Sequence, residues 1–174
     1  HDVTDSLGAY IPGKIFLIPS SIKAGEIVRF LQEGYDVGVL HEGFRKLIER
    51  LELDVLMIDT HPGLNEETLL SIVLADAIGL ILRPDQQDYQ GTAVTLEVAR
   101  QLGVERILLI VNKVPPVFDP EAVRKLVEET YQCEVAAVLP HSDDMMALAS
   151  SGIFALHFPN HPVTLGLKEL ADKL

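Results

Sequence analysis

The sequence predicts an α/β fold, in which a mostly parallel sheet is covered by helices on both faces. Three observations indicate this class. Short apolar runs alternate with helix-like stretches along the whole chain, the run DVLMID at 54–59 is almost continuously apolar, and helix caps separate several segments. The 174 residues are 48% hydrophobic and contain no linker or internal repeat. We therefore expect a single domain with one core.

In the first half of the chain, strands are expected at short apolar runs and helices where apolar residues recur every three or four positions. The spacing of Leu40, Phe44, Leu47 and Leu51 is the clearest helical pattern. The expected elements are, in order, a strand at 15–19, a helix at 23–32, a helix at 37–51, a strand at 54–59, a helix at 67–75 and a strand at 77–83.

In the second half, helix ends are marked by residues with known positional preferences. Gly103 is expected to end one helix, and Asp119 followed by Pro120 is expected to start another. The expected elements are a helix at 92–102, a strand at 106–112, a helix at 119–131, a strand at 134–140, and two helices at 143–152 and 165–174.

Residues 8–15, GAYIPGKI, match most of a phosphate-binding loop pattern, because Gly8 and Gly13 stand four residues apart and Lys14 follows. The pattern needs a Ser or Thr hydroxyl next, and Ile15 has none. A working loop also leaves a strand and opens a helix, whereas this one precedes an expected strand. We interpret Pro12-Gly13 as a turn.

Composition excludes several functions. The formal net charge of −12 repels phosphate backbones and anionic lipids, so nonspecific nucleic-acid binding is not expected. The sequence shows no transmembrane run or signal peptide, the C-terminal LKELADKL lacks the basic face of a peripheral membrane anchor, and we expect a cytoplasmic protein. The single cysteine, Cys133, is expected to be a small buried hydrophobe.

Asp59 ends the apolar run VLMI, so the expected strand would deliver its carboxylate to the edge where α/β proteins bind ligands. A carboxylate is costly to bury unless something binds it, and Mg²⁺ accepts one or two carboxylates while keeping several waters. This is a Walker B arrangement. Gly63, in the Pro-Gly loop that follows, would let the backbone approach a terminal phosphate. Alternatively, Asp59 only caps the loop.

Asn112 ends another expected strand, and an amide that donates and accepts can recognise a purine edge. A guanine-binding motif of the NKxD type would have Asp in its fourth place, at 115, but Pro115 stands there, so guanine specificity is not favoured. Residues 138–144, VLPHSDD, are expected to end a third strand. Their backbone groups can line a pocket for a nucleotide base. Both stretches have plainer interpretations, as a turn at Asn112 and a helix cap at Ser142.

Two other chemistries are not favoured by the sequence. His157 and His161 have the spacing of a helical metal-binding pair, but Pro159 between them would break that helix. The serines lack the G-x-S-x-G pattern of a hydrolase nucleophile.

Taken together, IDTHPG (58–63), LADAIGLILRPD (74–85), IVNKV (110–114) and VLPHSDD (138–144) resemble, in this order and spacing, the MinD/ParA family of deviant-Walker ATPases. The resemblance covers most of the chain. It implies a three-layer P-loop NTPase-like fold and a homodimer, switched by ATP and stimulated by a protein partner, that positions division sites, chromosomes or other cargo.

The resemblance also implies residue roles. ATP or ADP with Mg²⁺ would be the ligands, Asp59 the magnesium-associated Walker B acid and Gly63 the switch II glycine. Asn112 would contact adenine. The base pocket would include Pro140, His141, Ser142 and Asp143.

Members of this family begin with a strand and a KGGxGKT-type loop, and these 174 residues contain neither. The resemblance therefore implies the C-terminal portion of a longer ATPase, inactive by itself. Without the absent strand, runs 54–59 and 77–83 would flank a gap with unpaired backbone groups, each costing about 1–3 kcal/mol if buried. The alternative is a non-catalytic scaffold that keeps the fold and has lost the phosphate loop.

Overall fold

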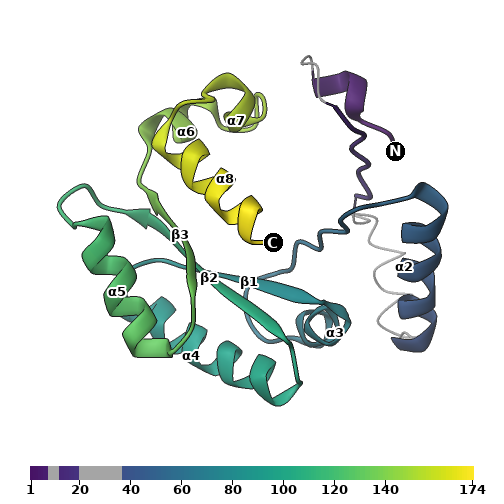
Figure 1. Cartoon of the computed structure of the whole chain (residues 1–174), viewed down its shortest axis with the longest axis horizontal. Coiled ribbons are helices and arrows are strands. Elements are labelled where there is room, and N and C mark those ends of the chain that lie inside the picture. Colours follow the sequence, from purple (N-terminus) through teal and green to yellow (C-terminus); the bar gives the residue numbers. More distant parts are fainter. Residues whose placement is uncertain (8–11, 20–36) are drawn as a thin grey trace. The chain divides into compact units, whose positions relative to one another are not determined.

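The computed structural model describes residues 1–7, 12–19 and 37–174, drawn in colour in Figure 1. The chain forms two compact units, residues 1–59 and residues 60–174, and each is described by itself. Within the described residues, no helix is long and apolar enough to cross a bilayer.

The first unit contains the short 3-10 helix η1 (Thr4–Leu7) and the helix α2 (Val37–Leu51). The predicted helix at 37–51 is confirmed. The predicted strand at 15–19 is wrong, because this segment makes only an isolated antiparallel bridge between Phe16 and Asp2. Two backbone bonds flank the bridge, from Val3 N to Ile15 O and from Leu17 N to His1 O. The predicted helix at 23–32 and residues 8–11 of the GAYIPGKI stretch lie outside the described residues.

The predicted strand at 54–59 is also wrong. These residues belong to no strand of the described part of the chain, and Val55 and Met57 are 69% and 78% exposed. The apolar composition of this segment predicted burial in a sheet. A strand, however, also needs a neighbour to take its backbone hydrogen bonds, and composition alone cannot show whether that neighbour is present.

The second unit carries the sheet, and here the predicted order of elements is confirmed apart from one additional short helix, α7. The elements are α3 (Glu66–Leu74), β1 (Ala77–Leu82), α4 (Gln86–Gln101), β2 (Arg106–Val114), α5 (Pro120–Tyr131), β3 (Val135–Pro140), α6 (Asp143–Leu148), α7 (Phe154–His157) and α8 (Pro162–Lys173). The strands are parallel, in the order β1-β2-β3. The predicted α/β class is therefore confirmed.

Three helices differ from their predicted bounds, each for a local reason. Helix α4 begins six residues early because the Asp85 carboxylate caps it, accepting hydrogen bonds from Gln87 N and Asp88 N. Helix α6 ends at Leu148, before the left-handed Ala149, rather than at Gly152. Helix α8 begins at Pro162 rather than at residue 165, and α7 was not predicted.

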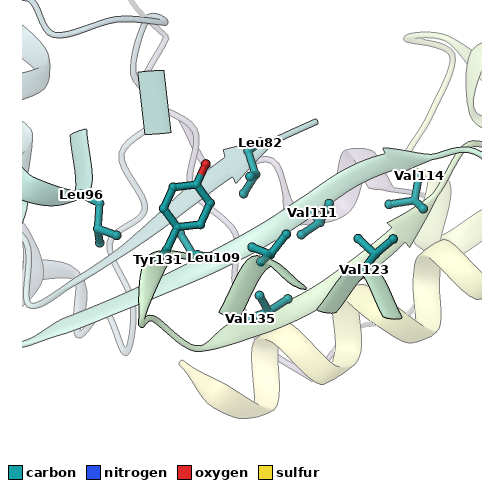
Figure 2. Close-up of a cluster of buried hydrophobic side chains, with 9 residues drawn as sticks. Leu82, Leu96, Leu109, Val111, Val114, Val123, Tyr131 and Val135 are labelled. Atoms are coloured by element: carbon teal, nitrogen blue, oxygen red, sulfur yellow. The ribbon is translucent and has the colours of Figure 1, made fainter. Parts of the chain in front are cut away.

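Helices cover both faces of the sheet (Figure 1). On one face, α4 and α5 pack over the larger core cluster, shown in Figure 2. On the other face, Leu167 and Leu170 of α8 pack against a smaller cluster. The larger cluster comprises Leu82, Leu96, Leu109, Val111, Val114, Val123, Val127, Tyr131 and Val135, and the smaller one Ile110, Ala137 and Leu139. This core holds the strand ends that form the candidate site.

The α8 face is covered only in part. Ile81 of β1 and Ile110 of β2 are register partners, so their side chains leave the same face of the sheet. Ile110 is 5% exposed, whereas Ile81 is 66% exposed. Strand β1 also has β2 as its one sheet neighbour in the described residues. Both the edge of β1 and its α8 face are therefore open in this unit.

Candidate functional site

All three strands are parallel, so their carboxyl ends lie along one edge of the second unit. Helix α8 runs antiparallel to β3, because Ser142, just past β3, meets His161 before α8, while Glu134, just before β3, pairs with Lys173 at the helix end. The start of α8 therefore lies at the carboxyl edge as well.

A β-bulge places Asn112 at this edge. Val111 pairs with Val138 and Val114 with Pro140, so β2 has one residue more than β3 between the two pairs. Lys113 takes up the extra length with a left-handed φ of 58°. The half-buried Asn112 accepts a hydrogen bond from Lys113 N at its Oδ1, 2.9 Å away. Among the described residues, its amide NH₂ group has no hydrogen-bond acceptor.

The loop after β3 is tied directly to the end of β2. The backbone N–H of His141 donates to the Val114 carbonyl at 2.9 Å, which fixes Pro140 and His141 beside the bulge. Ser142 then caps α6, its Oγ accepting from Met145 N at 3.1 Å. The His141 ring lies 3.2 Å from an oxygen of Asp143. The predicted cap at Ser142 is confirmed, and it does not conflict with a role in a pocket.

Gly63 adopts a backbone conformation that favours glycine. Its φ of 93° lies where side chains are strained, and a Cβ there would meet no atom within 4 Å. The backbone, rather than crowding, therefore requires glycine. The loop ends at Asn65, whose side chain caps α3 by accepting from Thr68 N at 2.8 Å.

Asp59 is the last residue of the first unit, and its side chain is exposed. The other predicted residues belong to the second unit. The structure thus brings Asn112 together with the loop 140–143 at one edge, whereas the pairing of Asp59 with Asn112 stays a prediction.

Sequence reasoning missed an ion pair at the end of β1. The Arg83 guanidinium donates to both carboxylate oxygens of Asp88, at 3.0 and 3.2 Å, and Arg83 N donates at 2.9 Å. These hydrogen bonds lower the pKa of Asp88 below its ordinary value of 3.8. The spacing R-x-x-x-x-D across an N-cap was the available signal. The pair ties the end of β1 to the first turn of α4.

His161 was missed as well, since the sequence offered it only as a metal ligand. His157 closes α7 and His161 caps α8, so they do not form a helical pair. In the described residues, no group of three or more His, Cys, Asp or Glu side chains could hold a metal ion. The free Cys133 is half-buried, and burial raises the pKa of its thiol.

Two hollows lie away from the carboxyl edge. One, of about 220 Å³, is lined by Asp76 and Glu105, which precede β1 and β2 at the opposite edge. The other, of about 280 Å³, lies between α4 and α5 beside Arg100. The Arg100 guanidinium donates to the carbonyls of Tyr131 and Gln132, so it already has acceptors. Neither hollow contains the polar groups that the sequence singled out.

Comparison with curated proteins gives one relevant relative. The chain is 27% identical over 148 residues to an uncharacterised ATP-binding protein of Methanocaldococcus jannaschii. The matched region is 79% of this chain and 56% of that protein, so the chain spans little more than half of its relative. No family model matches the chain.

Solved structures with a similar fold include three of MinD. The cell division ATPase MinD of Pyrococcus furiosus superposes with a TM-score of 0.69 at 18% identity, over 88% of this chain and 62% of that one. The Aquifex aeolicus MinD cell division protein gives 0.68 at 12% identity, covering 79% and 60%. The Aquifex aeolicus MinC:MinD complex gives 0.67 at 12%, covering 79% and 58%. The chain therefore shares the α/β fold of MinD ATPases.

Proposed function

We propose that this chain is the base-binding portion of a MinD/ParA-type ATPase that binds ATP at the carboxyl edge of its sheet. The observation that carries the proposal is the bulge that sets Asn112 beside the loop 140–143, tied together by the His141–Val114 hydrogen bond. In open α/β sheets, ligands bind at this edge. The MinD-like fold and the similarity to an ATP-binding protein support the choice of ligand.

Within this proposal, Asn112 donates from its amide to an adenine nitrogen, and the backbone of Pro140 and His141 lines one wall of the base pocket. Gly63, with its left-handed φ, lets the backbone approach the terminal phosphate. Asp59 supplies a carboxylate oxygen, which is the ligand type that Mg²⁺ prefers. When bound, Mg²⁺ neutralises phosphate charge. A nucleotide-bound Mg²⁺ takes most of its ligands from phosphates and water, so one exposed carboxylate fits it.

A strand and a helix from outside these 174 residues complete the sheet in the proposed protein. Three observations support this: the open edge of β1, the 66% exposure of Ile81 and the absence of a strand partner for residues 54–59 within the described chain. The coverage of 56% to 62% of the similar proteins leaves room for such a segment. That segment would also supply the phosphate-binding loop.

The complete protein is proposed to be a cytoplasmic homodimer, switched by ATP and stimulated by a protein partner, that positions cellular cargo. One structural neighbour is itself a MinC:MinD complex, which supports a protein partner. A non-catalytic scaffold of the same fold is the second candidate, because the described residues contain no phosphate-binding loop.

Calorimetric titration of the full-length gene product with ATP, with and without Mg²⁺, tests the function. We expect Asn112→Ala to weaken ATP binding about tenfold, equivalent to about 1.4 kcal/mol. We expect Asp59→Asn to remove the increase in ATP affinity that Mg²⁺ gives the parent protein. The matched controls, Gln101→Ala at the end of α4 and Asp54→Asn in the same extended segment, should bind as the parent does. A full-length protein that binds no ATP under either condition contradicts the proposal and favours the scaffold.

A further inference from the structure

The imidazole of His161 has a fixed proton arrangement. Its Nδ1 lies 3.1 Å from the backbone N–H of Val163, in the first turn of α8. A backbone N–H can only donate, so Nδ1 accepts and carries no proton. The proton of the neutral ring is therefore on Nε2, on the side that faces α6.

This proton arrangement determines how Ser142 can bond. Nε2 of His161 lies 3.3 Å from Oγ of Ser142, which also accepts from Met145 N at 3.1 Å. A serine hydroxyl has two acceptor positions and one hydrogen. Both acceptor positions face N–H donors here, so the hydroxyl can only donate further. Within the described part of the chain, no acceptor is paired with that hydrogen.

The His161 imidazole is held in place by its neighbours. The His161 side chain is 20% exposed and meets the Phe154 ring edge-on, with centroids 5.0 Å apart. An Asp144 carboxylate oxygen lies 3.9 Å from Nε2, which favours a proton there. The buried Thr164 donates to Phe158 O at 2.7 Å and fixes the start of α8.

We propose that His161 is a positioning residue that makes Ser142 a hydrogen-bond donor to an acceptor nitrogen of the bound adenine. The inference rests on the proposed function, because it places the base at the loop 140–143. His161 itself touches no ligand. Its Nε2–H occupies the acceptor position through which Ser142 could otherwise receive a hydrogen bond from the base. The site therefore favours a base with a hydrogen-bond acceptor at the point of the adenine ring that faces Ser142.

The first test is the tautomer. Long-range ¹H–¹⁵N correlation of the histidine rings, near neutral pH in the 174-residue chain, should show His161 protonated on Nε2. A ring protonated on Nδ1 overturns the inference. His161→Asn should retain the cap of α8, since Asn is a good N-cap, and should lose the contact with Ser142 because its side chain is shorter.

The second test compares ATP with its 1-deaza, 3-deaza and 7-deaza analogues, each lacking one acceptor nitrogen, on the full-length protein. The acceptor nitrogen contacted by Asn112 and the one contacted by Ser142 should each be marked by an analogue that binds about fivefold more weakly than ATP, the effect of one neutral hydrogen bond. For the analogue that reports on Ser142, the ratio of its dissociation constant to that of ATP should fall to about one in Ser142→Ala. In His161→Asn, where the hydroxyl hydrogen is no longer oriented, the ratio should decrease. Ser142→Thr, which keeps the hydroxyl, should keep the parent ratio.

The outcomes separate the two proposals. If ATP binds and neither variant changes the ratio for any analogue, the role of His161 is overturned while the proposed function stands. If no analogue is penalised, the adenine contact proposed for Asn112 is overturned as well. If ATP does not bind the parent protein, the proposed function and the role of His161 are both contradicted. Melting temperatures close to the parent value for His161→Asn exclude a loss of folding as the cause.

Discussion

Left-handed backbone conformations mark several turns of this protein. Among the described residues, four that are not glycine have a positive φ: Glu52, Lys113, Gln132 and Ala149. Such a residue costs about 1–2 kcal/mol relative to a right-handed one. Lys113 has this strained conformation inside the bulge beside Asn112. Strained backbone is typically retained where it serves a functional site. Gln132, by contrast, lies at the end of α5, away from the carboxyl edge.

Gln132→Gly should therefore stabilise the protein by about 0.5–1 kcal/mol, because glycine adopts φ of 49° without strain. The bond from Arg100 survives, since it uses the backbone carbonyl of residue 132. Urea unfolding measures the change. Gln132→Ala removes the same side chain and keeps the strain, so it should not stabilise. Equal effects of the two variants would show that the gain does not come from the backbone.

The Arg83–Asp88 pair should make the free energy of unfolding depend on pH in the acidic range. Hydrogen bonds from Arg83 lower the pKa of Asp88 in the folded protein, so its contribution is complete above the ordinary value of 3.8 and is lost as pH falls through the lowered pKa. Asp88→Asn should destabilise near pH 6, by less than about 1 kcal/mol because the pair is partly exposed, and should destabilise less near about pH 3, below the ordinary pKa of 3.8. Urea midpoints at the two pH values measure this. Asp172→Asn, on the exposed side of α8, should show no such difference.

At the scale of elements, α8 depends on one close approach to the sheet. A Cβ at Gly166 would lie 2.6 Å from Cδ2 of Leu139, a side chain that is 6% exposed in the core under α8. Helix α8 therefore sits so close to β3 that a side chain at position 166 would require the buried Leu139 side chain to shift. In α4, a Cβ at Gly91 would meet no atom within 4 Å.

The same substitution should consequently have opposite signs in the two helices. Gly91→Ala should stabilise by about 0.5–1 kcal/mol through helix propensity. Gly166→Ala should destabilise by about 1–3 kcal/mol, because it overpacks the core against Leu139. Thermal unfolding of the two single variants measures both. A stabilising Gly166→Ala would mean that α8 can move off β3 without cost.

Element boundaries show where sequence reasoning was sufficient. Helix α5 was predicted almost to the residue, because Asp119 and Pro120 specify its start through local chemistry. Helix α8 began earlier than its apolar pattern indicated, because a histidine cap is an uncommon signal. The failure at residues 54–59 has a different cause, since a strand is defined by a neighbour rather than by its own residues.

At the scale of the whole molecule, the open edge of β1 gives a direct test of the proposed missing segment. In the 174-residue chain, the β1 amides that do not face β2 should exchange hydrogen quickly, and in the full-length protein they should be protected. Hydrogen exchange of both proteins measures this. Strand β2, with neighbours on both sides, is the internal control. Equal exchange of β1 in the two proteins would contradict the proposed completion of the sheet.

The sequence by itself determined the α/β class and, apart from α7, the order of elements in the second unit, because periodicity and caps are local properties. It also singled out Asn112 and residues 140–143, at the ends of β2 and β3, as a predicted site. Only the tertiary structure decided that a bulge sets Asn112 beside the loop 140–143, that His161 meets Ser142, and that residues 54–59 have no strand partner in the described chain. These features depend on groups far apart in sequence, whose meeting no local pattern specifies.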